Sequence, residues 1–331
     1  MNDGHETNDS ATGRGALAIA VLVPCYNEEA TIAKVVDDFR TVLPQATVWV
    51  YDNASTDRTA QVAEEAGARV RREPLLGKGN VVRRMFADIE ADIYVLVDGD
   101  DTYDAGAAPE MVRRLIDGSL DMVAGARTPR DGSAYRPGHR FGNRVLSGIV
   151  GGLFGSRFTD MLTGYRALSR RFVKSFPVLT SGFEIETELT VHALELSMPV
   201  EEIPIDFRDR PEGSDSKLRT VRDGLRILTM ILVLLKEERP LGFFTSVFTI
   251  LALASVALAA PLLPTYLETG LVPRFPTAIL ASALMLLAFL SLAAGLILDT
   301  VTRGRRELKR MFYLTIPAPS ELSRRWSERG P

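Results

Sequence analysis

Two long apolar runs without a charged side chain, residues 243–263 and 276–298, lie in the last third of this 331-residue chain. At about 1.5 Å of rise per residue, a helix as long as the first run measures roughly 31 Å, which matches the hydrocarbon core of a bilayer. A short linker that contains Pro264 and Pro273 joins the two runs. We therefore predict a transmembrane helix hairpin over residues 241–300, and the rest of the chain must fold beside a membrane.

Basic residues flank this hairpin unevenly. Lys236 and Arg239 precede the first run, whereas the linker contains Arg274 as its one basic residue. Five basic residues follow the second run, namely Arg303, Arg305, Arg306, Lys309 and Arg310. Because basic residues accumulate on the cytoplasmic side of membrane helices, the pattern predicts a multi-pass protein of the cell membrane with both termini in the cytoplasm.

Strand and helix patterns alternate through the N-terminal two thirds of the chain. Strands are predicted at residues 16–24, 47–51, 69–71, 93–97 and 121–125, and helices at 27–43, 59–66 and 79–89. This order is typical of an α/β fold with a doubly wound, mostly parallel sheet, in which ligands bind at the carboxyl ends of the strands. The predicted division is a disordered tail at 1–15, an α/β domain at 16–217, a juxtamembrane helix at 218–240, the hairpin at 241–300 and a basic cytoplasmic tail at 301–331.

The juxtamembrane helix is predicted from residues 218–235, where arginines lie beside a growing leucine face. These residues are Arg219, Arg222 and Arg226 with Leu225, Leu228, Leu232 and Leu235. A basic, amphipathic segment of this kind suits the membrane interface. The alternative is a core helix with basic edges.

Composition argues against several classes of function and site. The net charge of −3 gives no sign of nucleic-acid binding. Cys25 is the one cysteine, which excludes an intramolecular disulfide. The chain has three histidines, His5, His139 and His192, so a Ser-His-Asp triad or a histidine-rich metal site is poorly supported.

Two carboxylates, Asp98 and Asp100, follow a predicted buried strand with Gly99 between them. They can share a divalent cation, since Mg²⁺ typically takes one or two carboxylates and completes its shell with water and substrate phosphates. Such a metal would neutralise a diphosphate leaving group. The alternative is an acidic surface turn, because Asp and Gly are ordinary turn residues.

Four segments, in this order and spacing, resemble the family 2 glycosyltransferases of the GT-A fold: residues 23–29, 52–57, 77–80 and 98–100. The resemblance covers about residues 16–235. Later segments look like the dolichol-phosphate-mannose-synthase-like branch, which includes bacterial polyprenyl-phosphate glycosyltransferases with a cytosolic catalytic domain and C-terminal membrane helices. These segments are residues 125–127, 140–143, 160–166, 182–188 and 213–218.

The resemblance implies roles for particular residues. Asp98 and Asp100 would hold Mg²⁺ or Mn²⁺ against the diphosphate of a nucleotide-sugar. The nucleotide-sugar site would comprise Pro24, Tyr26, Glu28, Asp52, Lys78, Asp98 and Gly99. The catalytic set would be Asp100 with Arg127, Arg140 and Lys217, whose cationic members would bind the acceptor phosphate or the donor diphosphate. Glu184, Glu186 and Glu188 are expected on a helix surface, and the alternative is that one of them approaches the sugar or the metal.

The implied reaction is transfer of a sugar, with inversion, to the phosphate of a polyprenyl lipid such as undecaprenyl, decaprenyl or dolichyl phosphate. A phosphate monoester has a second pKa near 6, so it is a competent nucleophile at pH 7 with little general-base help. Two alternatives stay open: a membrane-anchored glycosyltransferase with a protein or soluble glycan acceptor, and a non-catalytic membrane scaffold that retains the fold. The sugar, the base and homo-oligomer formation are also left open.

Overall fold

The computed structural model describes residues 17–129, 158–177, 184–208 and 236–317, together with residues 148, 182 and 233. The chain divides into two compact units, one formed by Met1–Leu218 with Phe312–Pro331 and the other by Arg219–Met311. Some predicted features lie outside the described residues: the tail 1–15, Arg140, Lys217, all of the helix 218–235 except Val233, and the chain beyond residue 317.

The first unit is built on a seven-stranded sheet with the strand order β3-β2-β1-β4-β6-β5-β7. Neighbouring strands are parallel except at β6, which runs antiparallel to both β4 and β5. The predicted mostly parallel α/β sheet is therefore confirmed. The strands are β1 (Ile19–Cys25), β2 (Thr47–Asp52), β3 (Arg69–Arg72), β4 (Ile93–Leu96), β5 (Met122–Pro129), β6 (Arg166–Ser169) and β7 (Val200–Phe207).

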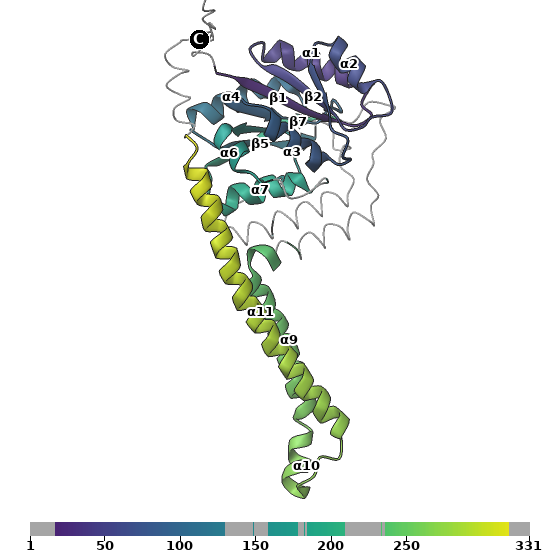
Figure 1. Ribbon diagram of the computed structural model, residues 1–331, viewed down its shortest axis with the longest axis vertical. Coiled ribbons are helices and arrows are strands. Elements are labelled where there is room, and N and C mark those ends of the chain that lie inside the picture. The colour runs from purple at the N-terminus through teal and green to yellow at the C-terminus, as the bar shows by residue number, and fades with distance from the viewer. Residues whose placement is uncertain are drawn as a thin grey trace, which may run out of the picture. The chain divides into compact units, whose positions relative to one another are not determined.

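Helices cover both faces of this sheet (Figure 1). The helices on one face are α1 (Ile32–Val42), α2 (Thr59–Glu65) and α4 (Ala108–Asp117), beside the short 3-10 helix η1 (Ala105–Ala107). Those on the other face are α3 (Lys78–Asp88), α6 (Arg170–Ser175) and α7 (Ile185–Glu195). Ring contacts of Phe176, which directly follows α6, with Phe86 of α3 and His192 of α7 join these three helices. Because both faces are covered, β1 is apolar along almost its whole length.

Two predicted elements differ from the structure by four or more residues at one end. The helix predicted at 27–43 begins at Ile32, because Asn27 has a left-handed φ of 54° and the Glu28 carbonyl accepts the amides of Thr31 and Ile32 in a turn. The strand predicted at 121–125 continues to Pro129, because its pairing with β7 continues to Phe207.

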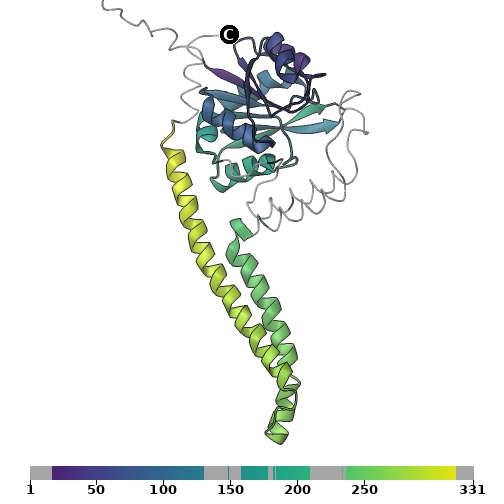
Figure 2. The same ribbon diagram turned by 45° about the vertical axis from the view of Figure 1, so that its right-hand side comes forward.

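The second unit contains two long helices that lie side by side and run antiparallel (Figures 1 and 2). They are α9 (Pro240–Ala259) and α11 (Phe275–Leu314), with the short helix α10 (Leu262–Thr269) between them in the chain. By length and composition, two helical segments, Pro240–Thr269 and Phe275–Leu314, are able to cross a membrane. The second is longer than the predicted apolar run, because the helix continues through the basic residues that follow it.

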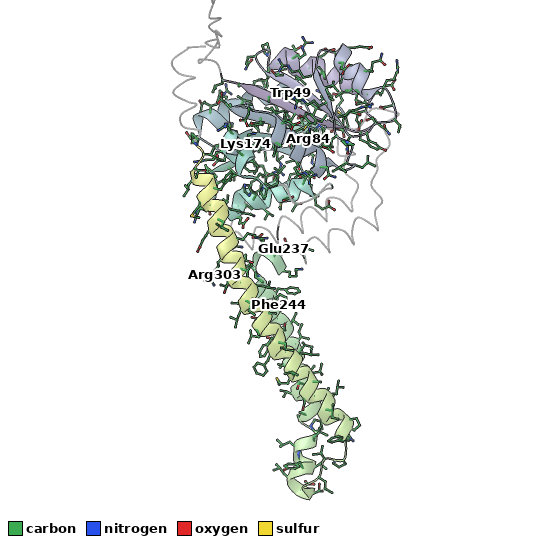
Figure 3. All side chains as sticks on the ribbon, in the orientation of Figure 1. Trp49, Arg84, Lys174, Glu237, Phe244 and Arg303 are labelled. Atoms are coloured by element: carbon green, nitrogen blue, oxygen red, sulfur yellow. The ribbon has the colours of Figure 1, made fainter. Side chains whose placement is uncertain are left out.

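Close contacts hold α9 and α11 together. The Ser255 hydroxyl donates to the Ala281 carbonyl at 2.6 Å, and a Cβ built at Gly295 would lie 2.8 Å from the Cβ of Phe244. Elsewhere apolar side chains project outward along both helices (Figure 3). Small residues at the contact therefore let the two backbones approach, which is how helices pack in lipid.

Candidate active site

Three loops follow β1, β2 and β4 at the same edge of the sheet. Each contains a non-glycine residue in the left-handed region, namely Asn27, Ala54 and Asp101, with φ of 54°, 57° and 54°. Backbone strain of this kind costs of order 1–3 kcal/mol and tends to occur at functional sites. Three of the five non-glycine residues with positive φ in the described part of the chain thus lie at the edge predicted to bind ligand.

The loops after β1 and β2 are hydrogen-bonded to each other. Asn27 accepts the amide of Thr56 at 2.8 Å, and its own amide donates to the Ser55 hydroxyl at 2.9 Å. The amide of Glu28 donates to the Thr59 hydroxyl at 2.9 Å. These bonds fix the segment that includes three predicted pocket residues, Pro24, Tyr26 and Glu28, all of which are half-buried.

Asp52 is fully buried at the end of β2. Its Oδ1 accepts the amide of Ser55 at 3.2 Å. Its Oδ2 lies 3.3 Å from the Arg72 Nε, close enough for an ion pair but without hydrogen-bond geometry. One buried carboxylate oxygen at this edge therefore lacks a hydrogen-bond donor.

Asn53, beside it, shapes the next loop. Its side-chain amide donates to the carbonyls of Glu73 and Leu75, and its Oδ1 accepts the amide of Gly77 at 2.7 Å. Gly77 directly precedes Lys78, the first residue of α3. Asn53 thus contributes to the placement of Lys78.

The Asp98-Gly99-Asp100 segment has no room for a side chain at its middle position. A Cβ at Gly99 would lie 2.6 Å from the Cys25 sulfur, which explains the glycine between the two carboxylates. Asp100 is buried, and its Oδ1 accepts the Thr102 hydroxyl at 2.6 Å. The Asp98 side chain is 28% exposed and lies 2.5 Å from the Lys78 ammonium.

These two carboxylates have the chemistry of a site for a hard divalent cation, whose preferred ligands are oxygen atoms. Within the described residues, no group of three or more His, Cys, Asp or Glu side chains gathers to hold a metal. A metal at Asp98 and Asp100 would therefore need oxygens from substrate phosphate or water to complete its shell.

Glu186 is a buried residue of this edge, whereas the sequence placed it on a helix surface. It is the second residue of α7, and its Oε1 lies 2.5 Å from the Lys78 ammonium. The surface expectation was wrong for Glu186 because it is buried together with its neighbours Ile185 and Thr187, whereas Glu184 and Glu188 are half-buried. Burial acts to lower the pKa of Lys78, but the charges of Asp98 and Glu186 outweigh it and raise that pKa, so the lysine stays protonated.

Arg166, also buried, fixes the start of α7. Its guanidinium donates to the carbonyls of Glu186, Met161 and Thr163 and to the Thr190 hydroxyl, at 2.9 to 3.1 Å. Burial without a hydrogen-bonded carboxylate lowers its pKa to about 10. The segment 160–166 that carries the family resemblance ends in this arginine, but the sequence did not predict its burial.

Arg127 lies near the end of β5, which has the same direction as β4. Its guanidinium forms a two-pronged pair with Asp160, at 2.6 Å from Nε and 2.8 Å from NH2, and lies 5.4 Å from the centre of the Phe207 ring. The structure thus brings Arg127 to the same edge as Asp98 and Asp100. Arg140 and Lys217 lie outside the described residues.

Comparison with known proteins agrees with this geometry. A model described as glycosyl transferase family 2 matches residues 20–175. The glycosyltransferase AglJ of Haloferax volcanii is 37% identical over 236 residues, which span 70% of this chain and 76% of that protein. This chain belongs to glycosyltransferase family 2. It is therefore an enzyme with a GT-A fold that uses a nucleotide-sugar, and the predicted family is confirmed.

Two further relatives of this family 2 glycosyltransferase have names that include a substrate or a bound ligand. A dolichyl-phosphate hexose transferase of Haloferax volcanii is 28% identical over 221 residues, which cover 67% of this chain and 95% of that protein. Among solved structures, glucosyl-3-phosphoglycerate synthase from Mycobacterium tuberculosis, in complex with Mn²⁺, UDP and glucosyl-3-phosphoglycerate, has a TM-score of 0.53. It is 25% identical, and the match covers 66% of this chain and 79% of that one.

Proposed function

We propose that this chain transfers a sugar from a nucleotide-diphosphate-sugar to polyprenyl phosphate at the cytoplasmic face of a membrane. The observation that carries the proposal is the pair of apolar helices on the same chain as the glycosyltransferase domain. In their most apolar stretches only 6% and 17% of the residues are buried, whereas a core helix of a soluble protein is mostly buried. Lipid is the surrounding that suits such helices, and a polyprenyl phosphate would dissolve in the same bilayer.

The relatives support a phosphate acceptor. One of them is named a dolichyl-phosphate hexose transferase, and another is solved with a sugar already joined to phosphoglycerate. Both names describe a sugar attached to a molecule that carries a phosphate. A polyprenyl phosphate combines that group with the apolar chain that α9 and α11 lead us to expect.

The donor would lie on the loops after β1, β2 and β4. Pro24, Tyr26, Glu28 and Gly99 would contact the nucleotide. An N–H group of the base would satisfy the buried Asp52 Oδ2, which has no hydrogen-bond donor of its own. An unsatisfied buried carboxylate oxygen is costly, so this contact would favour bound nucleotide.

Asp98 and Asp100 would hold Mg²⁺ or Mn²⁺ beside the diphosphate, and the solved relative contains Mn²⁺ together with UDP. When bound, the metal would offset the negative charge of the leaving nucleoside diphosphate. The hydrogen bond from Thr102 restricts Asp100 to one orientation. Lys78 would supply a further positive charge near the diphosphate.

The acceptor phosphate, largely dianionic at pH 7, would be the nucleophile. One of its oxygens would bond to the anomeric carbon as the bond from that carbon to the diphosphate breaks, in a single in-line displacement with inversion. Arg127, Arg140 and Lys217 would offset repulsion between the two phosphate groups. Asp160 would hold the Arg127 guanidinium in a fixed plane for this task.

The cytoplasmic location follows from the basic residues beside the hairpin. The division into a catalytic domain, a juxtamembrane amphipathic helix at 218–240, a hairpin and a basic tail belongs to the same proposal. The amphipathic helix would lie in the interface near the phosphate of the lipid.

The test incubates membranes containing the full chain with labelled nucleotide-sugars and two acceptors, a polyprenyl phosphate and soluble 3-phosphoglycerate. We expect label in the solvent-extracted lipid with at least one donor. Asp100→Asn should reduce that label by about 100-fold or more, since metal stabilisation of the diphosphate is worth several kcal/mol. Label that enters the soluble acceptor alone, or no loss in Asp100→Asn, would contradict the proposal.

A further inference from the structure

At the candidate site, the Lys78 ammonium is shared by the buried Glu186 carboxylate and the partly exposed Asp98 carboxylate. The Lys78 Nζ lies 2.5 Å from Asp98 Oδ1 and 2.5 Å from Glu186 Oε1. The side chains of Lys78 and Glu186 are each 9% exposed, so water contributes little to the solvation of either charge. The Asp98 carboxylate that would bind a metal is thus already paired with the Lys78 ammonium.

A divalent cation and Lys78 would compete for Asp98. Asp98 and Glu186 are the carboxylates that pair with Lys78 in the described part of the chain. With Glu186 present, the ammonium keeps a buried partner when Asp98 turns toward a metal. Without it, the ammonium would lose its last carboxylate partner, and a buried unpaired charge is strongly unfavourable.

Glu186 is well placed to stay where it is. Its backbone carbonyl accepts a hydrogen bond from the buried Arg166 at 2.9 Å, and Arg166 also bonds Thr190 one turn further along α7. Asp98, in contrast, is partly exposed. Of the two carboxylates, Asp98 has the freedom to change partner.

We propose that Glu186 is a positioning residue that retains Lys78 while the divalent ion takes Asp98, and so sets the affinity of the site for the metal. The inference rests on the proposed metal at Asp98 and Asp100. It assigns Glu186 an effect through Lys78, without contact to the substrate.

The experiment measures Mn²⁺ binding rather than turnover. The full chain in detergent is titrated with Mn²⁺ at a saturating concentration of one nucleoside diphosphate. The concentration of free Mn²⁺ is measured by electron paramagnetic resonance. That nucleotide is chosen from UDP, TDP, GDP, CDP and ADP as the one that most raises the melting temperature of the unaltered chain with Mn²⁺.

Glu186→Gln should raise the Mn²⁺ concentration at half-saturation by about tenfold. A neighbouring cation lowers the affinity of a carboxylate for a proton by about tenfold or more, and we expect an effect at the lower end of that range for the metal ion. The double variant Lys78→Gln with Glu186→Gln should return to within about threefold of the unaltered chain, because the competing ammonium is gone. The matched control is Glu90→Gln, which removes a carboxylate paired with Lys174 at 2.7 Å, just before β4 and away from the site. It should leave Mn²⁺ binding unchanged.

The outcomes separate the two proposals. If the unaltered chain binds Mn²⁺ and Glu186→Gln behaves like Glu90→Gln, the role of Glu186 is refuted while the metal site stands. The role is also refuted if the double variant binds Mn²⁺ as weakly as Glu186→Gln, since a merely structural glutamate would give that result. If the unaltered chain shows no Mn²⁺ binding with any nucleotide, both the metal site and the role fall. Should Glu186→Gln not fold, the double variant, which has no buried ammonium left to be unpaired, still decides by its half-saturation value.

Discussion

Gly164 sets the room available to Asp98. A Cβ built at this glycine would lie 2.4 Å from Asp98 Oδ2 and 2.9 Å from its carboxyl carbon. The Gly164 amide donates to the buried Tyr103 hydroxyl at 2.9 Å, so the backbone cannot easily retreat. One oxygen of the Asp98 carboxylate therefore pairs with Lys78, and the other has the space it needs because residue 164 is a glycine.

Replacing Gly164 by alanine should displace the Asp98 carboxylate and leave the fold intact, since the backbone there is not in the left-handed region. We expect transferase activity to fall by about 100-fold, as for a displacement of about 1 Å in a reacting geometry. The measurement is initial rate at saturating donor, with melting temperature as the check on folding. Gly242→Ala is the control, because a Cβ there would meet nothing within 4 Å. Equal rates for both variants would contradict the role of Gly164.

Residues of the candidate site could be predicted from the sequence where they directly follow a strand or begin a helix. Asp98 and Asp100 come directly after a buried strand, and Lys78 begins a helix after a glycine, so position alone brought them to the ligand-binding edge. Glu186 and Arg166 could not be predicted in this way. Both are charged residues buried by contacts between segments far apart in the chain, and no local pattern records such contacts.

At the scale of elements, the loop after β1 depends on Asp57 in the loop after β2. Asp57 Oδ2 accepts the Glu29 amide at 3.2 Å, and Oδ1 accepts the amide and hydroxyl of Thr59 at the start of α2. Burial acts to raise the pKa of Asp57, but the hydrogen bonds from Thr59 and Glu29 outweigh it and lower that pKa. The ionised carboxylate therefore joins two loops of the nucleotide site.

This arrangement predicts a pH dependence of stability. Because the pKa of Asp57 is lower in the folded chain than in the unfolded chain, its contribution is present above the ordinary carboxyl range and is lost as pH falls through the folded pKa. Asp57→Asn should lower the melting temperature at pH 7, and the difference from the unaltered chain should shrink below about pH 4. Melting curves of both chains from pH 7 to pH 3 test this. A difference that stays constant over that range would contradict it.

Elements in the first half of the sheet were easier to predict than those in the second. The strands predicted before residue 100 correspond to β1, β2, β3 and β4, because regular alternation with helices makes each one a separate apolar segment. β7 carries Glu201 and Glu202 and has an exposed Pro204 between the buried Ile203 and Ile205. It lies at the edge of the sheet, where proline is tolerated, and its pattern is correspondingly weak.

At the scale of the molecule, the second unit has polar contacts toward one end and apolar surface along its length. Glu238, just before α9, pairs with Arg305 and Arg306 near the end of α11 at 3.4 and 2.9 Å. Glu237 and Arg303 mark this end of the helix pair in Figure 3. Along the helices, side chains such as Ile250, Leu253 and Ile297 are more than half exposed. An ion-paired end beside an apolar stretch is what a membrane hairpin with one charged interface requires.

We expect opposite accessibility to a reagent outside the cell at two positions of the second unit. The segment after α10 should face the side of the membrane away from the catalytic domain, and the end of α11 should face the cytoplasm, because the basic residues gather there. In intact cells, a membrane-impermeant maleimide should label Leu271→Cys, and should label Glu307→Cys only after the membrane is permeabilised. Both positions are exposed in the structure, and the native Cys25 is buried, so it should add little background. Labelling of Glu307→Cys before permeabilisation, with Leu271→Cys protected, would contradict this orientation. The Asp98 site would then lie on the opposite side of the membrane from the cytoplasmic nucleotide-sugars.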